Sequence, residues 1–350
     1  MLRHPRARAA RRLTALLLGA LLSLPLVAPV TAHAALGDVV VYEVPSFDAF
    51  TIGITAGPDG NVWFTESGTN KIGRITPTGD VTEYPVPTPG STPALVTSGP
   101  LNSLWFTEST GNQVGQITTS GDITEYPLPI AGSNPLGIAA GPDGNLWIAE
   151  NGINSIGLMV PNGSSIPIQL PHANSSVRGI TAGPDGNLWF TEYLGNRIGR
   201  ITTSGDITEY PLPNAGSLPD GITAGPDGNL WFAEGAGRIG RITPSGSITE
   251  FPLPDPATSL TGITSGPDGN LWFAEGASHI GRITTSGDIT GFPLPGPARL
   301  PYYLTAGADR GIWFTEIWGS AIGRLDPLAA PTAAPAAGLA ARPSAPSTAG

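Results

Sequence analysis

Short apolar segments separated by turn-forming residues recur along most of this 350-residue chain. One copy, from Gly179 to Pro213, contains the segments GITAG, LWFTE, NRIGRIT and ITEYPLP. PDGN lies between the first and second segments and TSGD between the third and fourth, and Asp-Gly and Gly-Asn pairs favour the positive φ of tight hairpins. Prolines end the fourth segment because proline cannot continue a β-ladder. Each copy therefore predicts four short antiparallel β-strands.

Tryptophan marks the period of this repeat. Seven tryptophans are separated by 42, 42, 42, 42, 41 and 41 residues: Trp63, Trp105, Trp147, Trp189, Trp231, Trp272 and Trp313. Four-stranded units of this length are typical of propeller blades. The 48 Gly and 37 Pro residues agree with many short strands and turns rather than helices. We therefore predict an all-β, seven-bladed β-propeller of four-stranded antiparallel blades.

The two ends of the repeat region predict how the ring closes. The seventh unit stops at AIGRLDP (321–327) without a fourth strand, whereas DVVVYEVP (38–45) resembles a fourth strand without its first three. The N-terminal strand is therefore expected to complete the last blade, which removes the free edges of a linear stack. The predicted propeller covers residues 35–326.

The segments outside the repeats have their own patterns. Residues 1–34 combine several arginines, an apolar run and small residues around Ala34, which is typical of a secretory signal peptide and predicts a secreted protein. A retained N-terminal membrane anchor is the alternative, which Pro25 and Pro29 disfavour. Residues 327–350 are rich in Pro and Ala and cannot bury a core, so they are predicted to form a disordered tail or a wall-spanning spacer.

Charge and cysteine content exclude several classes of partner. Removal of the signal peptide would leave 12 basic against 27 acidic side chains, a net charge of about −15. Such a surface repels nucleic acid and anionic membranes, so we expect neither as a partner. We expect a monomer whose ligand is a small cyclic peptide, another peptide or a glycan. The chain has no cysteine, which excludes disulfides, thiol catalysis and thiolate metal sites.

A glutamate ends the second strand of every unit: Glu66, Glu108, Glu150, Glu192, Glu234, Glu275 and Glu316. These residues are expected on the face that carries the connections from fourth to first strand and from second to third strand. One interpretation is structural: each carboxylate accepts backbone hydrogen bonds or pairs with a basic residue of the adjacent blade, the candidates being the recurring Arg74, Arg200, Arg241, Arg282 and Arg324. The other is functional: some glutamates face the channel, where a pKa rises or a divalent cation binds.

The most variable repeat position lies fourteen residues before each of these glutamates. It holds Ile52, Ala94, Leu136, Arg178, Asp220, Thr261 and Tyr302. Because repetition indicates scaffold and asymmetry indicates function, we predict that this ring near the channel mouth specifies a substrate pocket. For Arg178 and Asp220, which lie in adjacent units, a simple ion pair is the alternative.

Two histidines and four aromatic residues complete the candidate site residues on this face. His172 lies in the loop that enters the fourth unit, and His279 follows the second strand of the sixth. Each is a candidate for proton transfer, His279 with Glu275, and solvated bystanders are the alternative. Stacking surface for a ligand would come from Tyr193, Tyr302, Tyr303 and Trp318.

The phrases GITAGPDGNLWFTE and NRIGRITTSGDITEYPLP resemble the virginiamycin B lyase (streptogramin B lyase) family across all seven units, about residues 38–326. The resemblance implies a seven-bladed propeller that linearises cyclic depsipeptide antibiotics by Mg²⁺-dependent elimination across an ester C–O bond. The metal would steady the charge that develops when the proton beside a carbonyl is removed. The resemblance also implies Glu316 as a metal ligand, and Glu275 is the equivalent residue of the preceding unit.

Three of the four functional positions that the resemblance implies hold a different residue type. The two histidine positions hold Thr261 and Tyr302, and the second metal carboxylate position holds Leu300. Threonine is no base at neutral pH, leucine cannot bind a cation, and tyrosine with its usual pKa of about 10 is a poor base. These residues favour a secreted propeller that binds a peptide, glycan or wall component on its acidic face. The alternatives are the Mg²⁺-dependent lyase, with Glu316 and Tyr302 or a loop histidine, and a metal-dependent hydrolase or lactonase.

Overall fold

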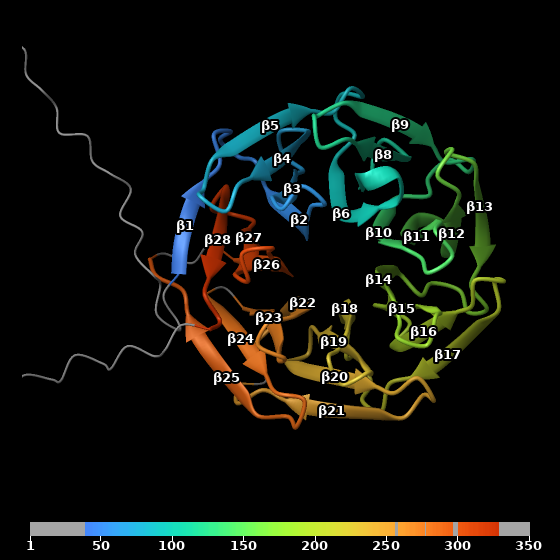
Figure 1. Ribbon diagram of the computed structural model, residues 1–350. Coiled ribbons are helices and arrows are strands. Elements are labelled where there is room, and N and C mark those ends of the chain that lie inside the picture. The colour runs from blue at the N-terminus through green and yellow to red at the C-terminus, as the bar shows by residue number, and fades with distance from the viewer. Residues whose placement is uncertain (1–38, 256–257, 277, 297–299, 329–350) are drawn as a thin grey trace, which may run out of the picture. The chain divides into compact units, whose positions relative to one another are not determined.

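The computed structural model describes residues 39–328, apart from 256–257, 277 and 297–299. These residues form seven four-stranded antiparallel sheets arranged around a central channel (Figure 1), which confirms the predicted seven-bladed propeller. No helix in the described part is long and apolar enough to cross a membrane. The predicted signal peptide and residues 329–350 of the predicted tail lie outside the described residues.

Each of the first six blades consists of four consecutive strands. Blade 1 contains β2 (Thr51–Ala56), β3 (Val62–Glu66), β4 (Lys71–Ile75) and β5 (Val81–Pro85). Blade 2 contains β6 (Pro93–Gly99), β7 (Ser103–Glu108), β8 (Gln113–Ile117) and β9 (Ile123–Pro127). Blade 3 contains β10 (Pro135–Ala140), β11 (Leu146–Glu150), β12 (Ser155–Met159) and β13 (Ser165–Gln169). Blade 4 contains β14 (Val177–Ala182), β15 (Leu188–Glu192), β16 (Arg197–Ile201) and β17 (Ile207–Pro211). Blade 5 contains β18 (Pro219–Ala224), β19 (Leu230–Glu234), β20 (Arg238–Ile242) and β21 (Ile248–Pro252). Blade 6 contains β22 (Leu260–Ser265), β23 (Leu271–Glu275), β24 (His279–Ile283) and β25 (Ile289–Pro293). Two 3₁₀ turns, η1 (Pro100–Asn102) and η2 (Asn151–Ile153), interrupt loops of blades 2 and 3.

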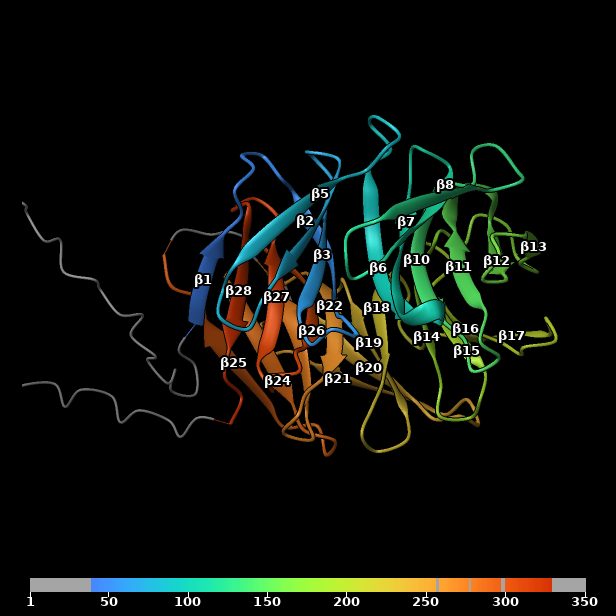
Figure 2. The same cartoon turned by 45° about the horizontal axis from the view of Figure 1, so that its top comes forward.

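Blade 7 joins the two ends of the repeat region. It contains β26 (Pro301–Ala306), β27 (Ile312–Glu316), β28 (Ala321–Leu325) and the N-terminal β1 (Val39–Glu43). Strand β1 pairs antiparallel with β28, from Val39 opposite Leu325 to Glu43 opposite Ala321. This pairing confirms the predicted closure of the ring. In each blade the first strand lines the channel and the fourth lies outermost (Figures 1 and 2).

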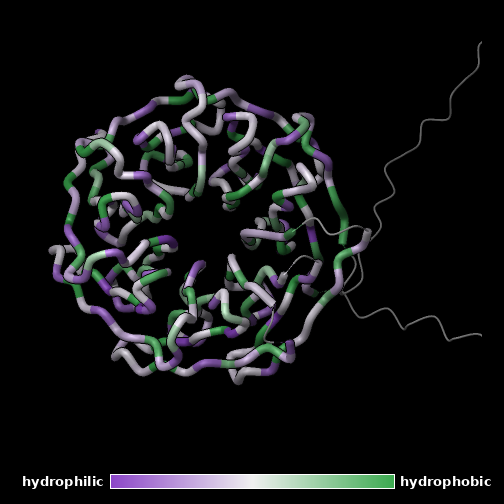
Figure 3. Tube along the Cα trace, turned by 180° about the vertical axis from the view of Figure 1, so that it is seen from behind, coloured by the Kyte–Doolittle hydropathy of each residue, from purple (hydrophilic) through white to green (hydrophobic). Residues whose placement is uncertain are grey.

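The hydrophobic core is divided among the junctions between blades. Each buried cluster combines side chains of two adjacent blades, as where Trp189 and Ile198 of blade 4 pack with Leu230 and Phe232 of blade 5. Figure 3 accordingly shows hydrophobic and hydrophilic segments alternating within every blade. The ring is therefore held by seven similar apolar junctions, which compensates for the absence of disulfides.

The period-marking tryptophans organise the face opposite the glutamates. All seven are fully buried. The Trp189 indole stacks on Tyr210 of the fourth strand, donates its Nε1–H to Asp185 in the PDGN turn at 3.0 Å, and carries Arg200 at 5.8 Å from its ring. The arginines of this repeat position contact the tryptophan and, in blades 6 and 7, the turn: Arg282 lies 3.8 Å from Asp268, and Arg324 lies 2.6 Å from Asp309.

The prediction that these arginines pair with the strand-end glutamates is therefore wrong. The reason is register, because Arg200 lies opposite Trp189 whereas Glu192, three residues further along β15, lies opposite Arg197. The arginine and the glutamate thus lie at opposite ends of the blade.

We expect Asp185→Ala to lower the free energy of unfolding by about 1–2 kcal/mol, because the buried Trp189 N–H and the Asn187 side chain lose their acceptor. Burial raises the pKa of Asp185, but hydrogen bonds from Asn187 and Trp189 outweigh it and lower that pKa. The loss should therefore be present above about pH 4 and shrink below it, as urea unfolding at several pH values would measure. Asp206→Ala, in the exposed TSGD turn, is the control and should cost less than about 0.5 kcal/mol; equal losses would contradict the assignment.

Candidate ligand-binding site at the channel mouth

A cavity of about 310 Å³ lies where the first strands begin, at the mouth of the channel. Six of the seven residues of the variable repeat position line it: Ile52, Ala94, Leu136, Arg178, Asp220 and Tyr302. The structure therefore brings these unlike side chains from six blades to one place. The seventh, Thr261, donates a hydrogen bond from its Oγ1 to the backbone oxygen of Tyr302 at 2.6 Å.

A β-bulge in every first strand sets this position. In blade 4, Val177 lies opposite Glu192 and Ile180 opposite Phe190, so the first strand has one extra residue in this interval. The same shift occurs in the other six blades. The Thr191 hydroxyl accepts from the Gly179 N–H at 2.9 Å and donates to the Asp220 carbonyl at 2.7 Å, which ties the bulge to the next blade. Bulges re-aim side chains, and here they place one residue per blade at the rim of the channel.

An ion pair with an aromatic partner forms one wall of the cavity. Arg178 Nη1 lies 2.8 Å from Asp220 Oδ2, and the Arg178 guanidinium stacks 3.5 Å from the centre of the Tyr193 ring. The Asp220 residue is only 3% exposed. Burial raises the pKa of Asp220, whereas the Arg178 charge and a hydrogen bond from Tyr303 act against this rise. Arg178 and Asp220 thus form the ion pair that was the alternative interpretation, and both still face the cavity.

Tyr303 replaces a glycine of the repeat and reaches from blade 7 to blade 5. Five other blades have glycine at its position: Gly53, Gly137, Gly179, Gly221 and Gly262. The Tyr303 hydroxyl donates to Asp220 Oδ1 at 3.0 Å, which links blade 7 to blade 5. Its ring meets Tyr302 edge-on, with ring centroids 5.3 Å apart. Burial, followed by the Asp220 charge, raises the pKa of the Tyr302 hydroxyl, so this residue is a proton donor rather than a base at neutral pH.

The strand-end glutamates are buried inside the blades. Six of them are at most 1% exposed, and Glu275 is the partly exposed exception. Burial raises the pKa of five of these carboxyls to about 7: Glu66, Glu108, Glu150, Glu192 and Glu234. Each of these five glutamates has at least one buried carboxylate oxygen without a hydrogen-bond partner, so the expected backbone hydrogen bonds do not account for those oxygens. Their raised pKa values come from burial inside the blades.

The residues implied for Mg²⁺ do not fit that ion. Glu316 and Glu275 end the second strands of adjacent blades, and Leu300, at the second carboxylate position, offers no donor atom. Across the described ranges, no three His, Asp or Glu side chains are grouped as a metal site requires. Magnesium prefers several oxygen ligands in octahedral geometry, which Glu316, Glu275 and Leu300 do not supply.

The remaining candidate residues lie away from this cavity. His172 Nδ1 contacts the Glu209 carboxylate on the outer strand of blade 4, and His279 lies opposite Glu275 in blade 6. Trp318, in the turn between β27 and β28, is 68% exposed. None of the three is among the residues that line the channel-mouth cavity.

Several lining residues were not anticipated from the sequence. They are Ser67, Thr92, Leu95 and Ser109. A signal for two of them existed, because the residue directly after each strand-end glutamate also varies: Ser67, Ser109, Asn151, Tyr193, Gly235, Gly276 and Ile317. This second variable ring lies at the start of the loop that follows the second strand, beside the first ring.

Comparisons with known proteins agree with the sequence resemblance. The model of the virginiamycin B lyase family matches residues 30–167 and 142–344. A streptogramin B lyase structure is 39% identical, with a TM-score of 0.79 over 82% of this chain and 96% of that one. Virginiamycin B lyase from Staphylococcus aureus is 41% identical, with a TM-score of 0.79 over 82% and 98%. A catalytically inactive histidine-to-alanine form of that enzyme, with quinupristin, is 40% identical with the same TM-score and coverage. No protein among the functionally curated ones matches.

Proposed function

We propose that this chain, which belongs to the virginiamycin B lyase family, binds a compact peptide-like ligand at the channel mouth and does not linearise it. The cavity there supports this proposal because it combines apolar walls with a few polar groups, and none of the described residues that line it is a histidine. We further propose that the protein is secreted, on the pattern of residues 1–34.

The lining of the cavity favours a peptide over a glycan. Ile52, Ala94, Leu95 and Leu136 supply apolar walls, and hydroxyl groups from serine and threonine stand between them. Small-molecule sites are mostly apolar with a few placed polar groups, which suits a cyclic depsipeptide with apolar side chains. The Tyr302 hydroxyl is a candidate donor to a ligand carbonyl, and the Arg178–Asp220 pair supplies charge at one wall.

The same residues disfavour the elimination reaction. That reaction requires a base beside the carbonyl, and the two histidine positions hold Thr261, whose hydroxyl donates to a backbone carbonyl, and Tyr302, whose pKa is raised. Leu300 replaces the second carboxylate. The inactive S. aureus form with quinupristin indicates that a relative changed at one histidine still associates with the antibiotic. Binding without cleavage is therefore compatible with this fold.

We expect the purified chain to bind quinupristin in the presence of Mg²⁺ while the mass of the antibiotic stays unchanged. Calorimetry would measure the binding and mass spectrometry the linearisation. Arg178→Ala should weaken binding at least fivefold, because it removes one wall of the cavity and leaves the Asp220 carboxylate without its cation. Linearisation that Glu316→Gln abolishes would contradict the proposal and support the Mg²⁺-dependent lyase. Absence of binding would also contradict it.

A gain-of-function variant tests the stated reason for inactivity. The triple variant Thr261→His, Tyr302→His and Leu300→Glu restores the residue types that the family resemblance implies. We expect this variant to linearise quinupristin slowly, at a rate that depends on added Mg²⁺. If the triple variant folds and binds but remains inactive, the three positions are not what limits the reaction.

A further inference from the structure

A second cavity lies in the channel, next to the cavity at the channel mouth, and has a volume of about 210 Å³. Its lining residues stand one to three positions after the variable repeat position, as Ile180 and Thr181 follow Arg178. Because the first strands line the channel (Figure 1), this interior cavity lies further along the channel than the mouth.

The two cavities differ in their chemistry. None of the described residues that line the interior cavity is charged, whereas Arg178 and Asp220 line the mouth. Threonine hydroxyls both donate and accept hydrogen bonds, so the interior offers such bonds to a peptide segment that reaches it. The threonines that line it are Thr55, Thr181, Thr223 and Thr264.

The boundary between the two cavities is formed by Leu95 and Tyr303. Both residues line both cavities, and no other described residue does so. They are also the two residues that replace glycine at their repeat position, which the other five blades keep as glycine. The boundary therefore arises where two blades depart from the repeat.

The Tyr303 side chain extends along this boundary from blade 7. Its ring lies beside Gly262 of blade 6, because a Cβ built on Gly262 would lie 3.2 Å from Tyr303 Cδ1. Its hydroxyl donates to Asp220 Oδ1 of blade 5 at 3.0 Å. Leu95 belongs to blade 2, which lies across the channel from blades 5 and 6 (Figure 1). The two side chains therefore bound the passage between the cavities from opposite sides.

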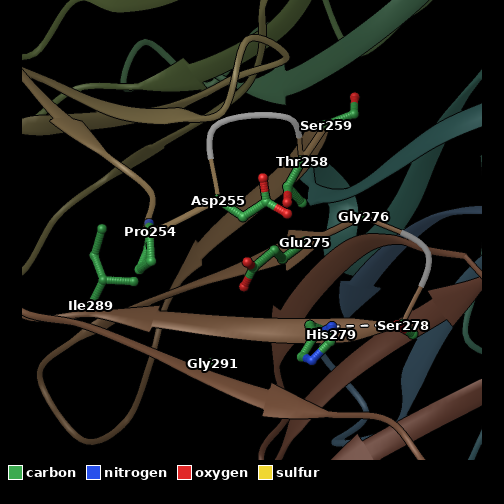
Figure 4. A pocket seen from close by; sticks show the side chains of 10 residues that line it. All are labelled: Pro254, Asp255, Thr258, Ser259, Glu275, Gly276, Ser278, His279, Ile289 and Gly291. Carbon is green, nitrogen blue, oxygen red and sulfur yellow. Dashed lines mark hydrogen bonds between the residues drawn. The ribbon is translucent and has the colours of Figure 1, made fainter.

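A third cavity, of about 580 Å³, lies apart from this passage in blade 6. Figure 4 shows Glu275 and His279 among the side chains that line it. Its described lining residues include none of those that line the two channel cavities. Glu275 and His279 therefore take no part in the boundary within the channel.

We propose, as a consequence of the ligand binding proposed above for the channel mouth, that Tyr303 determines the specificity of that site. Together with Leu95 it stops a ligand before the interior cavity. A cyclic peptide has no free end, so a closed floor does not obstruct it. A linear peptide has free ends that extend along the channel only where the interior is open. The ligand class is therefore a compact cyclic peptide, and linear peptides are selected against.

Calorimetry with quinupristin and its linear methyl ester tests this role. In methanolysis of the ring ester, methanol adds to the ester carbonyl and the ring oxygen leaves as a hydroxyl, so both probes carry the same side chains and charge. We expect the parent to prefer the cyclic probe and Tyr303→Gly to reduce that preference at least fivefold, because the linear probe gains access to the interior. Leu95→Gly should reduce it at least threefold, which tests the proposal if Tyr303→Gly does not fold.

Two control variants separate the ring of Tyr303 from its other contacts. Tyr303→Phe removes the hydrogen bond to Asp220 but keeps the ring, and should retain the preference for the cyclic probe. Leu136→Ala, which lines only the mouth, should weaken binding of both probes alike. Melting temperatures would show that each variant is folded.

The outcomes distinguish this role of Tyr303 from ligand binding itself. An unchanged preference in folded Tyr303→Gly and Leu95→Gly would overturn the role of the boundary, while quinupristin binding by the parent would still support the proposed function. Binding of either probe by Tyr303→Gly but not by the parent would support the boundary and contradict the proposed function. If neither protein binds either probe, both proposals are wrong.

Discussion

Replacement of Asp220 by alanine is expected to lower the free energy of unfolding by about 3 kcal/mol. The substitution leaves the Arg178 guanidinium partly buried without its carboxylate, and it removes the acceptor of the Tyr303 hydroxyl. Removal of one partner of a buried pair typically costs about 3–5 kcal/mol, and the lower end applies because the Arg178 side chain is 31% exposed. Chemical denaturation at pH 7 would measure the loss.

A double substitution distinguishes an uncompensated charge from lost packing. Arg178→Met combined with Asp220→Leu removes both charges and should recover most of the stability that Asp220→Ala loses, since apolar residues of similar volume often replace a buried pair without cost. Lys71→Met is the control, because the Glu83 carboxylate that loses its cation is 13% exposed, against 5% for Asp220, and keeps two hydrogen bonds from Ser46; it should cost less than about 1 kcal/mol. If the double variant is as unstable as Asp220→Ala, the cost comes from the cavity and the lost tyrosine bond instead.

The fold could be predicted almost completely from local patterns. The tryptophan period, the Asp-Gly turns and the prolines that end the fourth strands each define structure within one blade. In this chain the last blade lacks a fourth strand, and the N-terminal segment supplies one. The pairing of β1 with β28 follows from those two facts. Each step concerns residues that are near in sequence or equivalent in the repeat, which is why periodicity was sufficient.

The site could be predicted only in part, because the place of a residue in the repeat does not determine which way its side chain points. The variable position was found from the sequence, and the bulge brings six of its residues to one cavity. The hydrogen bond between Tyr303 and Asp220 joins residues that lie 83 positions apart and in different blades, so no local pattern predicts it. The arginine partners were misassigned because a repeat position does not reveal which end of a strand it faces.

The burial of the glutamates has a consequence for the pH dependence of stability. For Glu150, burial raises the folded-state pKa to about 7, above an ordinary value near 4.5. Between these values the native state holds a proton that the unfolded chain releases, so stability falls as pH rises from about 4.5 to 7 and then levels off. The shift corresponds to at most about 3 kcal/mol for one group. Four other glutamates shift in the same direction, so the protein should melt several degrees lower at pH 8 than at pH 5.

Glu150→Gln tests this origin most directly, because burial is the single cause of the Glu150 shift. We expect the variant to be more stable than the parent by about 1–3 kcal/mol at pH 8 and nearly equal to it at pH 5, since glutamine matches the protonated acid in size and charge. Glu83→Gln should behave in the opposite way. Burial raises the pKa of Glu83, but hydrogen bonds from Lys71 and Ser46 outweigh it and lower that pKa. Its ionised form is therefore the stabilising one, and Glu83→Gln should destabilise the protein at pH 8 and lose that effect below about pH 4. A Glu150→Gln effect that does not change between pH 5 and pH 8 would show that this carboxyl is already ionised in the native blade.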